Sequence, residues 1–264
     1  MNYKLDEKSI ESFSAYPCVD RAQECIALSG VFDLPKRKGT TEYNWGTSIE
    51  AFVDKEDIEL DGRTLTFKVC IKGVSYKDYS TKLETYKSAC LSCRKLSSDF
   101  GTFDIVMKDT LNVEEYTVCN MAIVTTKFWQ QKYSYPELII KPAGNGSFLM
   151  DDYDLSKDFG IYIASRKSDK NIPKRIEVNT TLPYTQTRYR VANDITFTCS
   201  MIGKDLQDLY SKMMQFQALC IKPGIRTLVL PRNGKYNIYF KDGITVKARL
   251  NTLLKFDLKC RVVT

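Results

Sequence analysis

The chain has 264 residues, with a hydrophobic fraction of 43% and a charged fraction of 27%, which suits one large or two ordinary globular domains. Its net charge of +7 is spread along the chain without a Lys/Arg block, so a basic nucleic-acid-binding tail is not indicated. The sequence has no histidine, which excludes Ser-His-Asp catalysis, Cys-His catalysis and His-ligated metal sites.

The N-terminal residues, Met1–Glu7, are polar and lack the apolar core of a signal peptide. No apolar run reaches the length of a membrane span. The cysteine count of nine is odd. We therefore expect a protein made in a reducing cytoplasm, whose cysteines are mostly free and serve as small core residues.

In the first part of the chain, Cys25–Leu28 opens the regular structure and a long excursion follows between Thr40 and Arg63. Leu65–Ile71 alternates apolar and polar residues, which predicts a half-buried strand. A helical period comes next, with Ser75 as a candidate N-cap. Its apolar residues recur at steps of three and four: Tyr76, Tyr79, Leu83, Tyr86 and Cys90. Phe103, Ile105 and Met107 then predict a second strand.

The same order of elements recurs farther along. Leu65–Gly73 resembles Ile195–Gly203 at an offset of 130 residues, and the match continues without a gap to Cys90 and Cys220. It pairs Asp78 with Asp208 and Lys82 with Lys212 on the way. Two further blocks match in the same order: Gly101–Asp109 with Gly234–Asp242, and Leu34–Arg37 with Ile172–Arg175. Three ordered blocks predict an internal duplication.

The second part of the chain yields the same prediction on its own. Ile195–Met201 alternates as a strand, and Asp205 is the candidate cap of a helix that Pro223–Gly224 ends. The apolar stripe of that helix is Leu206, Leu209, Met213, Phe216 and Cys220. Tyr236, Ile238 and Phe240 predict the next strand, and Lys241–Gly243 has the composition of a hairpin turn.

The fold class predicted is β-rich α+β, with two tandem similar β-sandwich or barrel units that each pack one α-helix. The Gly- and Pro-rich stretch Lys141–Ser147 is the expected boundary, which gives domains 1–145 and 146–264. Phe159–Ala164 is expected to open the second unit, as Cys25–Leu28 opens the first.

Candidate chemistry is sparse. Cys90 and Cys93 form a C-x-x-C pair, but no second pair follows at zinc-site spacing, so we interpret them as packed thiols. A bridge between Cys18 and Cys25 is possible on spacing alone and is disfavoured in a reducing compartment. Gly144-Asn145-Gly146 lacks the Lys-Ser/Thr of a phosphate-binding loop. We therefore predict no catalytic residue, no metal, no cofactor and no enzymatic activity.

The pattern of Leu28–Pro35, then Leu60–Phe67, then a helix resembles the distal tail proteins of tailed bacteriophages, and more widely the tail-tube and baseplate-hub superfamily. The resemblance implies a tail-tube-like fold and a structural ring around the tail channel, in the virion tail and assembled in the host bacterial cytoplasm. It implies self-association as a hexamer, or as a trimer with pseudo-six-fold symmetry, beside tail-tube, tape-measure and baseplate proteins. Many distal tail proteins have a dissimilar second domain, so the repeat here favours the hub-like trimer. No membrane is implied, and no nucleic acid beyond DNA passing through the channel.

Large aromatic and basic residues on the excursions are the candidate inter-subunit contacts. They are Tyr43, Trp45, Tyr184, Arg188, Tyr189 and Arg190. For Trp45, packing onto its own sheet is an equal alternative. A second hypothesis for function is a basic, β-rich protein that binds single-stranded nucleic acid through Tyr236, Tyr239 and Phe240. An enzyme on a β-rich scaffold ranks third, because no constellation of catalytic groups is apparent.

Overall fold

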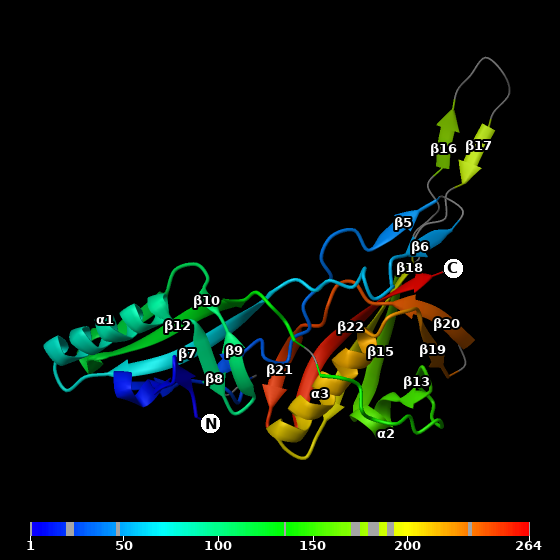
Figure 1. Ribbon diagram of the computed structural model, residues 1–264. Helices are drawn as coiled ribbons and strands as arrows, with labels where there is room; N and C mark the ends of the chain where they lie inside the picture. The colour runs from blue at the N-terminus through cyan, green and yellow to red at the C-terminus, as the bar shows by residue number, and fades with distance from the viewer. Residues whose placement is uncertain are drawn as a thin grey trace.

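The computed structural model describes residues 2–19, 24–45, 48–134, 136–169, 175–178, 185–188, 193–231 and 234–263. Across these residues the protein is a β-rich α+β fold in which strands far outnumber the three α-helices. Figure 1 shows two halves side by side, with α1 (Tyr76–Ser92) on one and α2 (Leu155–Phe159) and α3 (Leu206–Cys220) on the other.

The first half contains two sheets. One has the order β2-β1-β8-β9 and the other the order β10-β12-β7-β3, with β11 also paired to β12 and β4 to β7. A 3₁₀ helix, Ile10–Phe13, precedes β3, and another, Thr117–Cys119, precedes β12. The strands are β1 (Lys4–Leu5), β2 (Lys8–Ser9), β3 (Ala15–Pro17), β4 (Leu28–Ser29), β7 (Arg63–Lys72), β8 (Lys95–Ser98), β9 (Gly101–Asp104), β10 (Val106–Met107), β11 (Asn112–Tyr116) and β12 (Met121–Gln130).

The second half contains one large sheet of order β14-β13-β19-β20-β22-β18-β15, with β21 also paired to β22. Two hairpins stand apart from the sheets: β5 (Glu42–Asn44) with β6 (Ile49–Ala51), and β16 (Arg175–Val178) with β17 (Thr185–Arg188). The strands of the large sheet are β13 (Leu149–Met150), β14 (Tyr153–Asp154), β15 (Ile161–Asp169), β18 (Asn193–Ile202), β19 (Arg226–Leu230), β20 (Gly234–Tyr239), β21 (Val246–Leu250) and β22 (Leu253–Val263).

The strands β7 and β18 and the helices α1 and α3 lie where the periodicity predicts them. Leu65, Phe67, Val69 and Ile71 are fully buried along β7, as are the inward residues of β18. Ser75 and Asp205 accept hydrogen bonds from the N–H groups of Asp78 and Asp208, so both predicted N-caps are confirmed. Because the capping and the alternation are local signals, the sequence was sufficient to find these elements.

The pairings in the two halves follow the same register. Lys72 of β7 pairs with Met121 of β12, and Ile202 of β18 pairs with Leu253 of β22. Val106 of β10 pairs with Trp129, and Tyr239 of β20 pairs with Arg261. The order of strands across the halves also agrees, with β9 and β10 standing where the second half has the single strand β20.

The start of the first half lies earlier than Cys25–Leu28, which corrects the expectation from sequence. The β1–β2 turn has positive φ at Asp6 and Glu7, and the β13–β14 turn has positive φ at Asp151 and Asp152. The Asp6 carboxylate accepts from the Lys95 N–H at 2.8 Å, and that of Asp151 accepts from the Thr227 N–H at 2.7 Å. Strands of two residues carry almost no periodic signal, so these hairpins were missed.

A second correction concerns Lys241–Gly243, which does not form a hairpin turn. The strands on either side, β20 and β21, do not pair with each other, and both pair with β22 at different places along it. Position 243 requires glycine for a different reason. Its φ is +73°, and a Cβ there would lie 2.3 Å from the Leu34 carbonyl oxygen. A segment of the first half therefore passes directly over this loop.

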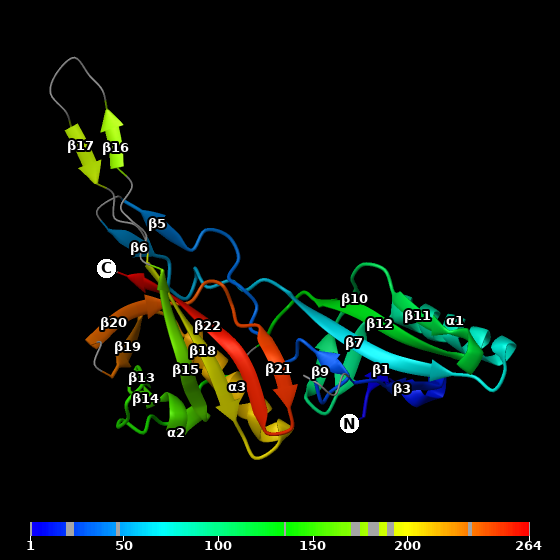
Figure 2. The ribbon, with the colours of Figure 1, turned by 180° about the vertical axis from the view of Figure 1, so that it is seen from behind.

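One hydrophobic core runs through both halves. It includes Phe32, Tyr86 and Phe128 of the first half and Phe159 and Phe216 of the second. The excursion Leu34–Leu60 reaches over the second half, where Leu34 and Ile244 exchange two backbone hydrogen bonds of 2.9 Å. Figures 1 and 2 show β5 and β6 beyond the first half, next to the end of β18. The expected boundary near Lys141–Ser147 lies in an irregular stretch between β12 and β13.

Candidate interaction surface

The β5–β6 hairpin carries two of the predicted contact residues at its exposed end. Tyr43 and Trp45 are 50% and 62% exposed. Their rings pack edge to face with centroids 4.5 Å apart, and the indole Nε1–H donates to Glu50 Oε2 at 2.8 Å. Trp45 thus does not pack onto the large sheets, and the pair forms a fixed aromatic knob that a partner can bury.

The base of the hairpin is held by charges from the second half. The Glu42 carboxylate lies 3.4 Å from Lys241 Nζ and 3.3 Å from Arg261 Nη2, and it accepts a hydrogen bond from the Tyr239 hydroxyl. Burial, followed by this hydrogen bond to Glu42, raises the pKa of Tyr239 well above its usual range. The hairpin is therefore attached firmly to the second half, although it belongs to the first half by sequence.

A buried arginine fixes the other side of the excursion. The Arg37 guanidinium donates to the Asp57 carbonyl at 3.0 Å and to the carbonyl of Phe52. Burial lowers the pKa of Arg37. The Phe52 carbonyl is thereby bonded, and the Asp57 carbonyl, which also accepts from the Glu59 N–H at 3.1 Å, gains a second donor, so the guanidinium links two points of the loop that supports the knob.

The remaining predicted contacts lie on or near the second hairpin. Arg188 ends β17, where its Cα partner in the ladder is Arg175 of β16. Tyr184, Tyr189 and Arg190 lie outside the described residues. Figures 1 and 2 place both hairpins at the same end of the molecule, with β16 and β17 projecting farthest. The structure thus brings Tyr43 and Trp45 together and puts the Arg188 backbone at the same end.

Sequence reasoning missed the junction between the halves. Buried Arg63 donates to the carbonyls of Val31 and Asp33, each at 2.9 Å, and lies over the ring of Tyr133 at 4.6 Å. Buried Gln217 of α3 donates to the Phe32 carbonyl at 2.8 Å and accepts from the Tyr133 hydroxyl. No local pattern marks a buried Gln or Arg, because its partners lie far away in sequence.

The edge of β21 is the second missed feature. Glu24 and Arg249 form a two-point ion pair, with Nε and Oε2 2.6 Å apart, and the Cys25 N–H donates to the Arg249 carbonyl at 2.8 Å. Nearby, the Val246 N–H donates to Asp33 at 2.9 Å. Burial raises the pKa of Asp33 despite that hydrogen bond and the nearby guanidinium groups of Arg249 and Arg63. First-half residues therefore cover a strand edge that would otherwise be open.

The cysteines singled out from the sequence are all free thiols, and the C-x-x-C pair is buried. Cys18 and Cys25 are free thiols, so no bridge joins them. Cys90 and Cys93 are fully buried, and burial raises the pKa of the Cys93 thiol to about 11. A thiol with a raised pKa is a poor nucleophile, which fits the interpretation of packed thiols. Among the described residues, no cluster of acidic or cysteine side chains has the geometry of a metal site.

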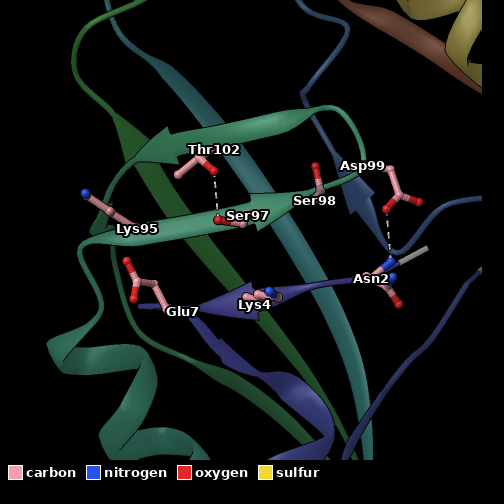
Figure 3. Close-up of a pocket in the computed structure, with 8 residues that line it drawn as sticks. All are labelled: Asn2, Lys4, Glu7, Lys95, Ser97, Ser98, Asp99 and Thr102. Carbon is pink, nitrogen blue, oxygen red and sulfur yellow. Dashed lines mark hydrogen bonds between the residues drawn. The ribbon is translucent and has the colours of Figure 1, made fainter.

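A hollow of about 740 Å³ lies over the sheet of β1, β8 and β9 (Figure 3). Asn2 and Asp99 close one end through a 3.3 Å hydrogen bond, and Ser97 bonds Thr102 across two strands at 2.9 Å. Lys4, Glu7 and Lys95 also line it. Its lining is polar and of mixed charge, without the apolar wall that small-molecule sites commonly have.

No family model matches this chain, and neither does any curated protein. In the described residues, no helix is long and apolar enough to cross a membrane. The exposed Tyr43–Trp45 knob and the projecting β16–β17 hairpin are the candidate contact surfaces.

Proposed function

We propose that this protein is a non-enzymatic structural component of a phage tail tip or baseplate, a distal-tail or hub-like protein that forms a ring around the tail channel. The observation that carries the proposal is the agreement of strand order and register between the halves. The pairs Lys72–Met121 and Ile202–Leu253 are one example of that agreement. A chain that presents one framework twice is suited to a ring built from equivalent units.

We propose further that each half is a tail-tube-like unit with one long helix, α1 or α3, although the second half also has the short helix α2. In the first half, α1 buries Tyr79, Leu83, Tyr86 and Cys90 against β7 and β12. In the second half, α3 follows β18 after the same number of residues as α1 follows β7. The two sheets of the first half and the single sheet of the second are variants of one strand order. This similarity supports domains near 1–145 and 146–264.

The contact between the halves supports assembly by rotation. It joins unlike surfaces: the segment Glu24–Arg37 of one half lies on the Lys241–Arg249 edge of the other. Such a heterologous contact, repeated from chain to chain, closes a ring or extends a filament. A trimer would present six units, and a hexamer twelve, around one channel.

The proposed partners are further copies of the chain and the neighbouring tail-tube, tape-measure and baseplate proteins. The Tyr43–Trp45 knob and the β16–β17 hairpin are the proposed contact points, because both project from the same end of the molecule. The alternative of single-strand binding loses two of its three aromatic platforms. Tyr239 and Phe240 are 2% and 5% exposed and are therefore not free to stack on bases.

Light scattering after size exclusion, followed by electron microscopy of the same fraction, tests the proposal. The chain has a mass of 30.3 kDa, and we expect a species of three or six times that mass that appears as a ring with a central hole. A monomer at every concentration up to the solubility limit would contradict it. Strong, salt-sensitive binding to a single-stranded oligonucleotide would instead favour the alternative.

A further inference from the structure

The edges of β11 and β21 occupy matching places but differ in what covers them. Val113 of β11 pairs with Val124 of β12, and Val246 of β21 pairs with Phe256 of β22 at the corresponding position. The free edge of β21 is covered by Glu24 and Leu34 of the first half. In the described part of the chain, β11 pairs only with β12, so its other edge is open.

Exposure of the side chains follows the same difference. Ile244 and Val246 are almost fully buried beneath the first-half segment. At the corresponding positions, Leu111 and Val113 are only partly buried, and Glu114 and Glu115 are exposed. An open strand edge with half-covered apolar residues is a template for pairing with another chain.

Charge indicates which segment fits this edge. Residues 109–116 contain three acidic residues and no Lys or Arg. Residues 165–190, which begin in β15 and include β16 and β17, contain seven Lys or Arg and two Asp or Glu. This basic arm begins within the β15–β18 ladder, which extends to Asp169, and the rest of the arm follows β15 as residues 30–34 follow β4 in the first half.

The ladder of β16 and β17 pairs the backbone of Arg175 with that of Arg188. Figure 2 places β11 in the first half and β16–β17 at the opposite end of the molecule, so the two do not meet within one chain.

We propose that the acidic edge of β11, residues Asp109–Tyr116, binds the basic arm of a second copy of this chain. This contact would repeat between chains the contact that Glu24–Leu34 makes with β21 inside the chain, and it rests on the proposed function as a ring of copies. The charges in the two contacts are opposite. Inside the chain, the acidic Glu24 of the first-half segment meets Arg249 of the β21 edge. Between chains, the basic arm would meet the acidic Glu114 and Glu115 of the β11 edge.

Charge reversal tests the assignment, with association measured by sedimentation equilibrium of the full chain. Glu114→Lys and Arg188→Glu are each expected to weaken association about tenfold, because reversal replaces attraction with repulsion. The double variant is expected to recover most of the loss. Glu84→Lys is the matched control: Glu84 is also an exposed glutamate of the first half with a single polar partner, Lys87, and its reversal is expected to change association less than twofold.

Carbodiimide cross-linking of a mixture of ¹⁵N-labelled and unlabelled protein gives an independent readout. We expect cross-linked peptides of mixed label that join Glu114 or Glu115 to a lysine of residues 165–190. A protein that assembles without such peptides, and in which Glu114→Lys behaves as Glu84→Lys does, would overturn this assignment but not the ring. A protein that stays monomeric would overturn both.

Discussion

The helices α1 and α3 stand at matching places in the two halves and yet have different surroundings. Each follows a long strand, and each begins with the same hydrogen bonds around Asp78 and Asp208. α1 buries one stripe and leaves its outer face to solvent. α3 is buried along its last eight residues, which include Met214, Gln215 and Gln217.

The cause lies outside the helices. The stretch after β12 crosses α3, where the Gln215 side chain donates to the Glu137 carbonyl at 3.0 Å and accepts from the Ile139 N–H at 2.8 Å. No such segment crosses α1 in the described residues. The same strand–helix arrangement therefore leaves its helix at the surface in the first half and buries its helix in the centre of the molecule in the second.

The largest effect on stability is expected when a residue on the outer face of one helix is replaced by the type found at the matching position of the other. Met214 is buried and Glu84 is exposed at the corresponding position of α1. Met214→Glu places an unpaired carboxylate in the junction and is expected to lower the free energy of unfolding by at least about 3 kcal/mol. Glu84→Met loses one exposed ion pair and is expected to change it by less than about 0.5 kcal/mol. Urea unfolding measures the free energy of unfolding of both variants. Equal losses of stability would contradict the proposed difference in burial between the two helices.

A medium effect is expected at Gln217, whose counterpart in α1 is Lys87. Gln217→Leu leaves the Phe32 carbonyl and the Tyr133 hydroxyl without their partner in a buried site. We expect a loss of about 1–3 kcal/mol of unfolding free energy. Lys87→Leu is the control and should have little effect. Thermal unfolding followed by circular dichroism distinguishes them, and an unchanged midpoint for Gln217→Leu would show that water replaces the lost bonds.

A smaller and equal effect is expected at the helix starts. Ser75→Ala and Asp205→Ala each remove a side-chain acceptor from the first turn, and each should cost about 1 kcal/mol in urea unfolding. Because the local structure is the same, the two losses should agree. A loss confined to one helix would show that the similarity of these starts is superficial.

The smallest effect is expected at Asp33, and it should depend on pH. Burial raises the pKa of this carboxyl, so the folded state disfavours its charged form. Asp33→Asn keeps an oxygen to accept from the Val246 N–H, and we expect it to stabilise the protein at pH 7 by less than about 1 kcal/mol. The gain should disappear below about pH 4, where the wild-type carboxyl is protonated in both states. A gain that is independent of pH would contradict this cause.

Local patterns were enough to predict β7, β18, α1 and α3, but not the similarly long β12 and β22. The stripe from Tyr76 to Cys90 identified the buried face of α1 except at Tyr76, which is 62% exposed. The same method found only half of what α3 buries, because Met214 and Gln217 face a segment that is distant in sequence. An apolar stripe predicts which face of a helix packs on its own sheet. It does not predict that a distant segment also packs on the opposite face.

The candidate site was predicted less completely. Tyr43 and Trp45 do form an exposed pair, which an aromatic residue on a loop suggested. Neither the ion pair of Glu24 with Arg249 nor the open edge of β11 was predicted. Both features depend on which strands lie at the edge of the folded sheet. That position is determined by how all the strands pair and cannot be read from one strand alone.

The hydrogen bond between Val246 and Asp33 joins residues 213 positions apart, and it fixes the first-half segment to β21. During synthesis at about 5–20 residues per second, that segment waits on the order of 10–40 s for its partner to emerge. For most of that interval Leu34 lacks its partner Ile244, and Phe32, which can already pack against Phe100, lacks its second aromatic partner Tyr210. The nascent chain therefore has a period of vulnerability to aggregation, and we expect holdase chaperones to raise the yield of native protein more than any change at the finished surface.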